Sequence, residues 1–120
     1  YGGDGTTSYG SDTTAAYRKV GGIVILDCKI YNIQDGGTAT ADFYIGNLPF
    51  TCARSMVAGN AMLRNVNLSN SCRNLNAYIT TAERIYIYQT VDNAAYDPIN
   101  YNHISNDDYV WVGVYYFTNQ

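Results

Sequence analysis

The segment Tyr109–Phe117, which reads YVWVGVYYF, limits the possible folds of this chain more than any other stretch. Its residue types are typical of a β-strand, and strand side chains alternate between the two faces of a sheet. One face is therefore valine and the other is aromatic, with Val110, Val112 and Val114 set against Trp111, Tyr115 and Phe117. A strand with one face in water should carry polar residues there. We expect both faces to be covered, either by loops of the same domain or by another copy of the chain.

The composition predicts a surface with few charges. Only 14% of the 120 residues are charged, against about a quarter in an average protein. The polar residues are mainly Asn, Thr, Ser and Gly, joined by 13 Tyr, and this mixture suits hydrogen bonding and ring stacking. A formal net charge of −3 argues against a nucleic-acid partner. No apolar run approaches the roughly 20 residues of a membrane span, so no membrane insertion is predicted.

The pattern of apolar runs and turn residues predicts an all-β fold. Helical periodicity is nearly absent, and residues 15–20 and 23–33 flank Gly21-Gly22 as a tight hairpin would. Further strands are expected at 42–48, at 53–68 as one or two strands, on both sides of a turn at 81–82, and at 109–117. About eight short strands at roughly ten-residue spacing indicate a jelly-roll-like antiparallel β-sandwich.

The chain divides into a short lead-in and one domain. Residues 1–14, YGGDGTTSYGSDTT, are polar and rich in Gly, Thr and Ser, as linkers are. We predict that this segment arrives from a longer upstream chain and that residues 15–120 form a single β-sandwich domain.

Two strands besides the closing one carry aromatic or apolar residues on a second face. Ile85 and Ile87 alternate with Tyr86 and Tyr88. The set Val24, Leu26, Cys28 and Ile30 is predicted to be core, opposite Ile23, Ile25, Asp27, Lys29 and Tyr31. One small domain has too little interior for all of these side chains, and contiguous apolar patches usually mark interfaces. The predicted interface residues are Tyr86, Tyr88, Trp111, Tyr115 and Phe117.

The loop from Val91 to Asp108 offers aromatic and amide side chains together. Tyrosine rings can stack on the C–H face of a sugar, and Asn and Asp side chains can bond its hydroxyl groups. The predicted ligand-binding residues are Tyr96, Asp97, Asn100, Tyr101, Asn102, His103, Asp107 and Asp108. The alternative is an ordered connection whose tyrosines pack back on the sandwich or across a subunit boundary.

Catalytic and metal-binding patterns are weak. The aspartates at 92, 97, 107 and 108 surround the only histidine, His103, but the spacing of a calcium loop is absent, and such residues usually form solvated turns. Glycosidase chemistry needs two facing carboxylates, and Glu83 is the only glutamate. We predict a non-enzymatic domain with no cofactor and no metal.

The cysteines do not form a recognisable framework. Cys28, Cys52 and Cys72 are odd in number and contain no CxxC pair, which argues against a zinc site and a complete disulfide framework. The favoured interpretation is three buried thiols, and one disulfide with one free thiol is the alternative.

Three motifs resemble those of the C-terminal domains of bacteriophage tail fibres and related viral receptor-binding proteins. The first is a Y-x-K-x-G-x-x-V strand pair, carried by Tyr17, Lys19, Gly21 and Val24. The second is F-x-[IL]-x-x-LPF, carried by Phe43, Ile45, Leu48, Pro49 and Phe50. The third is a closing G-x-Y-x-T strand, carried by Gly113, Tyr115 or Tyr116, and Thr118. The resemblance covers about 15–119, and the cysteines and the tyrosine-rich loop depart from it.

This resemblance implies a jelly-roll domain that forms a homotrimer at the distal tip of a virion fibre, with loops that attach to a host-surface glycan or protein. Two other interpretations stay open. One is a structural trimerisation cap or capsid-decoration module without a ligand. The other is a cellular carbohydrate-binding domain, which predicts a monomer with one exposed aromatic platform.

Overall fold

The computed structural model describes residues 10, 13–33 and 40–120, and every regular element in these residues is a β-strand. The strands are β1 (Thr14–Val20), β2 (Ile23–Ile33), β3 (Tyr44–Ile45), β4 (Met56–Arg64), β5 (Cys72–Thr80), β6 (Arg84–Val91), β7 (Asp97–Pro98) and β8 (Asp108–Phe117). The all-β prediction is confirmed. Most of the predicted lead-in lies outside the described residues, and so does part of the connection after β2.

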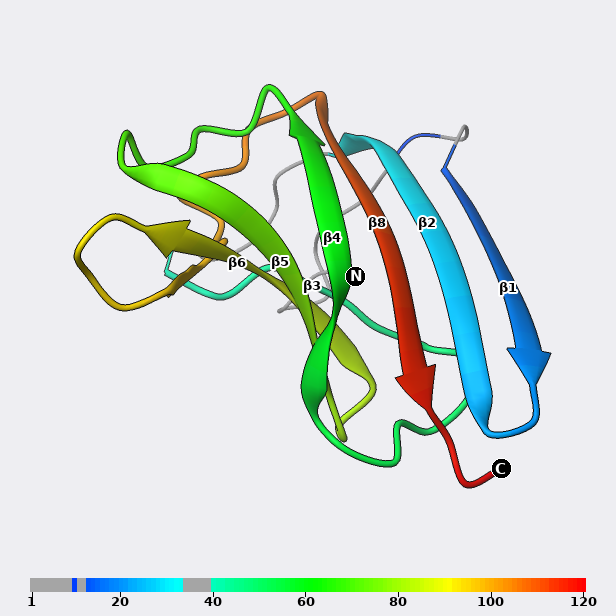
Figure 1. The fold of residues 1–120 in the computed structure, drawn as a ribbon. Helices are drawn as coiled ribbons and strands as arrows, with labels where there is room; N and C mark the ends of the chain where they lie inside the picture. Colours follow the sequence, from blue (N-terminus) through cyan, green and yellow to red (C-terminus); the bar gives the residue numbers. More distant parts are fainter. Residues whose placement is uncertain (1–9, 11–12, 34–39) are drawn as a thin grey trace.

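The strands form one continuous, curled antiparallel sheet of eight strands (Figure 1). Its order is β1-β2-β8-β4-β5-β6-β3, with β7 paired to β6. Because the sheet bends, β5, β6 and β3 come to lie across from β2 and β8, and the core fills the space between them. This single curled sheet is compatible with a jelly-roll-like sandwich, without establishing that connectivity.

The hairpins follow the turn chemistry of the sequence. Val20 pairs with Ile23 across Gly21-Gly22, and Gly21 adopts a φ of 57°, in the left-handed region that glycine enters without steric cost. The β5–β6 hairpin forms where it was predicted, but its turn spans 81–83, one residue more than the predicted 81–82. The segment at 53–68 forms a single strand, β4, which carries a bulge between Val57 and Gly59.

Strand β8 is an interior strand of the sheet, because it pairs with β2 on one side and with β4 on the other. Its inner residues are buried, and across the register Cys28 faces Val112 and Leu26 faces Val114. Burial confirms the predicted core face of β2 and places Ile85 and Ile87 in the same core. The inner residues of β8 are Val110, Val112, Val114 and Tyr116.

The outer face of the sheet is open in the part of the chain that the structure describes. Each described strand contacts the strands paired with it in the sheet. A further contact is between β5 and β8, which lie on either side of β4. Large apolar side chains consequently remain exposed on this face, including Ile25 at 54%, Met62 at 56% and Tyr115 at 49%. Among the described residues, no second layer of strands packs on the aromatic face of β8, although Arg54 lies over the Phe117 ring and Lys29 over the Trp111 ring. Coverage of this face by another copy of the chain stays a prediction.

A matched pair of glycines tests the packing of β4 against β8. A Cβ atom at Gly59 would overlap the carbonyl oxygen of Gly113, whereas a Cβ at Gly113 would meet nothing within 4 Å. We expect Gly59→Ala to lower the free energy of unfolding by about 1–3 kcal/mol, as overpacking does, and Gly113→Ala to change it by less than about 0.5 kcal/mol. Urea denaturation of both variants measures the difference. Equal effects at the two positions would contradict the close approach.

Two buried groups that can lose a proton, a phenol and a thiol, make the stability of the fold depend on pH in the alkaline range. Burial raises the pKa of the Tyr116 phenol, whose O–H donates to the Phe50 carbonyl oxygen at 3.1 Å, and burial also raises the pKa of the Cys28 thiol. In the unfolded chain these groups lose their protons at about pH 10 and about pH 8.5. Their contribution is therefore complete below those values and is lost as the pH rises through the folded-state pKa values.

We expect the urea concentration at the midpoint of unfolding to decrease as the pH rises from about 8 to about 11. Tyr116→Phe cannot ionise at this position, so its midpoint should fall less steeply over the same range. Parallel slopes for the two proteins would show that Tyr116 does not contribute.

Candidate binding site

The loop between β6 and β8 is pinned to the sheet at its start. Gln89 pairs with Asp97 and Tyr88 pairs with Pro98, which defines β7. The backbone N–H of Ile99 then donates to the Ile87 carbonyl oxygen at 2.8 Å, and Ile99 enters the core. Because the chain is held at these points, the residues just before β7 project over the outer face of β6.

Several predicted ligand residues lie inside the domain rather than on its surface. Tyr101 is 2% exposed and packs edge-on against Phe43, with ring centroids 6.0 Å apart. Asp108 is fully buried, and its carboxylate accepts hydrogen bonds from the Ser105 backbone N–H at 2.8 Å and the Ser105 hydroxyl at 3.2 Å. These contacts give both residues a part in holding the loop.

His103 ties two loops together. Its Nδ1 accepts the Asn100 backbone N–H at 3.1 Å, and its carbonyl oxygen accepts the Asn67 backbone N–H at 2.8 Å. Its Nε2 lies 3.4 Å from the side-chain nitrogen of the buried Gln89. The Gln89 side-chain oxygen in turn accepts the Ser69 backbone N–H at 2.8 Å. Through its backbone carbonyl and through the contact with Gln89, His103 thus joins the 65–71 and 99–107 loops at one end of the domain.

The remaining predicted ligand residues do not share one hollow. The Asn100 side chain accepts the Asn102 backbone N–H at 3.0 Å, which forms a local turn. The side chains of Asp97, Asn102 and Asp107 are exposed. Of the predicted ligand residues, only Tyr96 lines the tyrosine-lined hollow described next.

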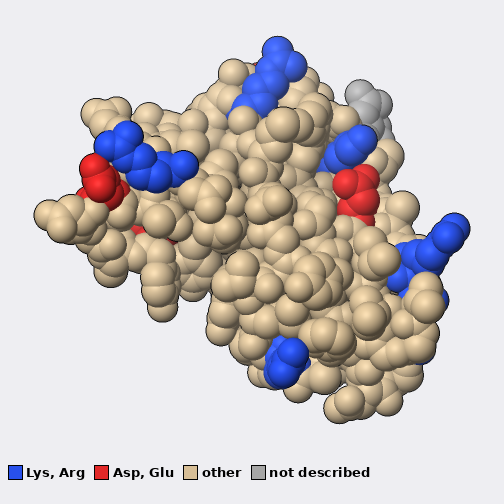
Figure 2. Space-filling view, in the orientation of Figure 1, with Lys and Arg blue, Asp and Glu red and all other residues tan. Residues whose placement is uncertain are grey.

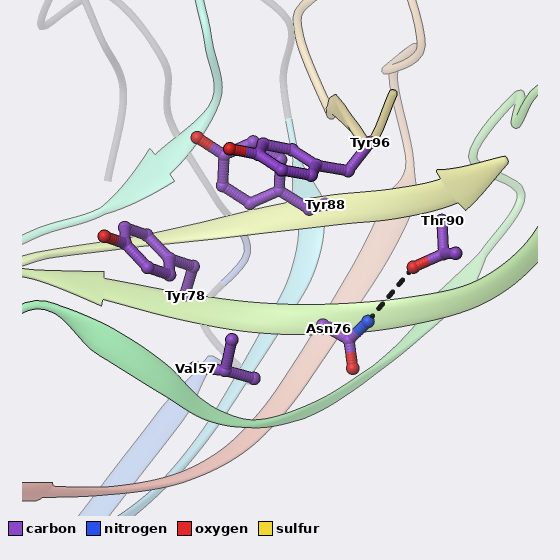
Figure 3. A pocket seen from close by; sticks show the side chains of 6 residues that line it. All are labelled: Val57, Asn76, Tyr78, Tyr88, Thr90 and Tyr96. Carbon is purple, nitrogen blue, oxygen red and sulfur yellow. Dashed lines mark hydrogen bonds between the residues drawn. The ribbon is translucent and has the colours of Figure 1, made fainter. Parts of the chain in front are cut away.

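A hollow of about 350 Å³ opens on the outer face of β4, β5 and β6. Figure 3 shows its lining, Val57, Asn76, Tyr78, Tyr88, Thr90 and Tyr96. Tyr96 is 72% exposed and approaches Tyr88 edge-on, with centroids 5.2 Å apart and planes at 88°. Tyr88 meets Tyr78 in the same way, at 5.9 Å and 88°. The rings therefore form perpendicular walls, an arrangement that aromatic pairs favour.

Two neutral polar side chains complete the lining of the hollow. The Asn76 amide donates to the Thr90 hydroxyl oxygen at 3.3 Å and accepts the Asn74 amide at 3.4 Å. This leaves the Thr90 O–H and the second N–H of Asn76 able to donate to a ligand. The pKa of Tyr88 is raised, first by burial and then by the carboxylate of Asp42 and the neighbouring tyrosines, so its phenol stays a neutral donor. The hollow thus combines ring faces with uncharged donors.

More tyrosines extend this surface toward the sheet edge. Tyr86 lies opposite Tyr78 across β5 and β6, and Tyr44 on β3 lies opposite Tyr86, with ring centroids 5.7 Å apart. Arg84 places its guanidinium 4.5 Å from the Tyr44 centroid and contacts the Tyr86 hydroxyl at 3.5 Å. Tyrosine side chains therefore cover much of the outer face of β3, β5 and β6.

The predicted interface residues fall into two groups on the outer face. Tyr86 and Tyr88 belong to the tyrosine surface, and both are half-buried. The others, Trp111, Tyr115 and Phe117, project from β8, where Tyr115 and Phe117 meet edge-on at 6.4 Å. The Trp111 indole N–H is shielded from solvent and has no hydrogen-bond partner among the described residues. Whether these residues bind a partner stays a prediction.

Sequence reasoning missed the floor of the hollow. Tyr78 and Asn76 lie opposite Tyr86 and Tyr88 in the β5–β6 register. Counting back from the predicted turn at 81–82 would set Tyr78 against Ile85, whereas the observed turn at 81–83 sets it against Tyr86. Because a shift of one residue in register exchanges the two faces of a strand, the length of the turn was the missing information.

The described residues hold no group of three or more His, Cys, Asp and Glu side chains placed to bind a metal ion. Cys28, Cys52 and Cys72 are free thiols. Cys28 and Cys52 are buried as predicted, whereas Cys72 is only half-buried. The Cys52 thiol donates to the Arg54 carbonyl oxygen at 2.9 Å. Over the described part of the chain, no helix is long and apolar enough to cross a membrane.

No family model, no curated protein and no solved structure matches this chain. The resemblance to phage fibre domains is therefore carried by its short motifs alone.

The contacts of Asp108 predict that its substitution destabilises the fold, whereas substitution of an exposed ligand residue would not. Asp108→Ala removes the buried carboxylate that accepts the Ser105 N–H and hydroxyl, so we expect the free energy of unfolding to fall by about 1–3 kcal/mol. Asp97→Ala removes an exposed carboxylate of the same loop and should change it by less than about 0.5 kcal/mol. Urea denaturation separates the two cases. A neutral Asp108→Ala would contradict the anchoring role.

Proposed function

We propose that this chain is a non-enzymatic attachment domain, which self-associates through the outer face of β2, β8 and β4 and binds a surface molecule of a host cell. The observation that carries the proposal is the apolar outer face of the central strands. An apolar, exposed face at the centre of a sheet is unusual for a monomer in water, and it matches the core of a subunit interface.

The distribution of charge supports this use of the face. Figure 2 views the molecule toward it, and the Lys, Arg, Asp and Glu side chains there are sparse and lie mainly toward the margin. Asp27 and Lys29 are the charged residues on the outer face of β2. Cations lie over three rings of β8: Lys29 over Trp111, Arg64 over Tyr109 and Arg54 over Phe117. Ile25 faces Tyr115 across the register, and Met62 faces Trp111. Removal of these side chains from water contributes about 25 cal/mol for each Å² of apolar area, which must exceed the loss of translational and rotational freedom on association.

The chemistry of the reactive side chains supports a non-catalytic role. Glu83 accepts a hydrogen bond from the Thr51 hydroxyl at 2.9 Å, and His103 is committed to its loop contacts. Burial raises the pKa of the Cys28 thiol, whereas a nucleophilic cysteine needs a lowered one. None of these groups is paired as an activated nucleophile and base would be.

The trimeric state and the place at a virion fibre tip follow from the resemblance of the three motifs to phage tail fibre domains. Three copies on one tip would present three equivalent recognition surfaces. Multivalent attachment then raises avidity by about 10²–10⁴ without a tight single site. A structural cap without a ligand would share the apolar face, and the tyrosine-lined hollow favours attachment over that alternative.

The oligomeric state tests the proposal. We expect light scattering to give three times the 13.3 kDa chain mass for the unmodified protein. Ile25→Asp and Trp111→Asp place a charge in the buried interface, so both should lower the mass to that of a single chain. Ala82→Asp adds the same charge at the exposed β5–β6 turn and should leave the mass unchanged.

Circular dichroism of each variant confirms that the sheet persists. A folded monomer for the unmodified chain would overturn self-association and leave a single-copy binding domain. An assembled protein that retains its mass in both face variants would place the interface elsewhere.

A further inference from the structure

We propose that the tyrosine-lined hollow is a binding site for an uncharged sugar in the pyranose form, such as the terminal hexose of a surface glycan. This inference rests on the proposed attachment function and names the site and the ligand class through which attachment would occur. It places recognition on the outer face of β4, β5 and β6, with Tyr96 as the one contribution from the long loop.

The ring geometry suits a pyranose. Tyr96 exposes 72% of its surface above the hollow, and its plane stands at 88° to that of Tyr88. One ring can therefore stack on the C–H face of a sugar while the other contacts its edge. Tyr78 adds a third wall, perpendicular to Tyr88. Contacts among the rings hold them in place before a ligand arrives, which lowers the entropic cost of binding.

The polar lining suits hydroxyl groups. Asn76 and Thr90 are joined at 3.3 Å on one side of the hollow, across from the tyrosine rings in Figure 3. The free Thr90 O–H and the second Asn76 N–H can donate to sugar oxygens, and Asn76 keeps acceptor capacity. Aromatic walls with a few placed polar groups are the usual composition of a small-molecule site.

Charge and size narrow the ligand class. None of the lining residues carries a formal charge. The neighbouring cation of the tyrosine surface, Arg84, is engaged with Tyr44 and Tyr86. An acidic sugar would find no counter-charge in the hollow, so a neutral one is favoured. A volume of about 350 Å³ is at the small end of ligand sites and suits one terminal residue rather than a long chain.

A competing use of the hollow is inter-subunit packing, because Tyr88 is also a predicted interface residue. The paired amide and hydroxyl argue for a ligand, since the centre of an interface is usually more apolar. The two uses differ in what a substitution changes. A substitution that destroys a sugar site lowers the affinity for the sugar and leaves the mass of the assembly unchanged. A substitution that destroys an interface lowers the mass of the assembly.

The test is a titration of the ¹⁵N-labelled chain with methyl glycosides of glucose, galactose and mannose, followed by NMR. N-acetylneuraminic acid serves as the anionic probe. We expect millimolar affinity for at least one neutral glycoside, with shifts centred on Asn76, Thr90 and Tyr96. Tyr96→Ala should weaken that affinity about tenfold or more, and Thr90→Val should weaken it while preserving the side-chain shape.

Tyr17→Ala is the matched control, because Tyr17 is another exposed tyrosine, at 57%, and it lies outside the hollow. Its affinity for the sugar should equal that of the unmodified chain. Light scattering on Tyr96→Ala should give an unchanged mass, which separates a ligand site from an interface.

Each other outcome overturns the inference in a distinct way. A lower mass for Tyr96→Ala would make the hollow an interface, and unchanged sugar binding in that variant would place the site elsewhere. Tighter binding of N-acetylneuraminic acid would overturn the neutral ligand class. An assembled protein that binds no glycoside overturns this inference and leaves self-association intact. A monomer that binds sugar through Tyr96 supports the hollow and overturns the proposed assembly.

Discussion

The backbone pairing of β8 with both β2 and β4 is the constraint on which the rest of the structure depends. The last strand of the chain lies inside the sheet, between β2 and β4, so each of its faces continues onto neighbouring strands. The inner face becomes the centre of the core, where Val112 meets Cys28 across the register. The outer face necessarily becomes the centre of the exposed surface. An edge strand with the same residues could not join the neighbouring side chains into a broad apolar patch.

The curl of the sheet divides the outer surface into two regions of different chemistry. Asn60 lies opposite Gly113 on one side and Asn76 on the other, so small and polar residues occur where the two regions meet. Beyond them, the β2–β8–β4 region carries branched and aromatic apolar side chains, which suit burial. The β5–β6 region carries tyrosines, whose rings and hydroxyl groups suit a wetter contact. Self-association and recognition can therefore occupy neighbouring parts of one sheet.

Local pattern was enough to predict the strands and their faces. Alternation assigned Leu26 to the core and set Ile87 on the face opposite Tyr88, and the Gly21-Gly22 pair located the first hairpin. The candidate site was predicted only in pieces, because Tyr96 was assigned to a ligand and Tyr88 to an interface. The two rings lie 5.2 Å apart. Their contact depends on the pairing of β7 with β6, which holds the loop against the sheet. Strand β7 has only two residues, and a strand this short has no recognisable sequence pattern.

The sequence by itself determined that this chain is all-β, that its closing strand has two water-avoiding faces, and that its surface is rich in tyrosine and poor in charge. These properties depend on residue type and period, which short-range sterics and hydrophobicity translate directly into strand and face. Only the tertiary structure decided that β8 is an interior strand, that Tyr101 and Asp108 are buried in the loop, and that Tyr78, Tyr88 and Tyr96 share one hollow. Strand order and the curl of the sheet arise from contacts between residues distant in the chain, and no local pattern encodes which distant partners will meet.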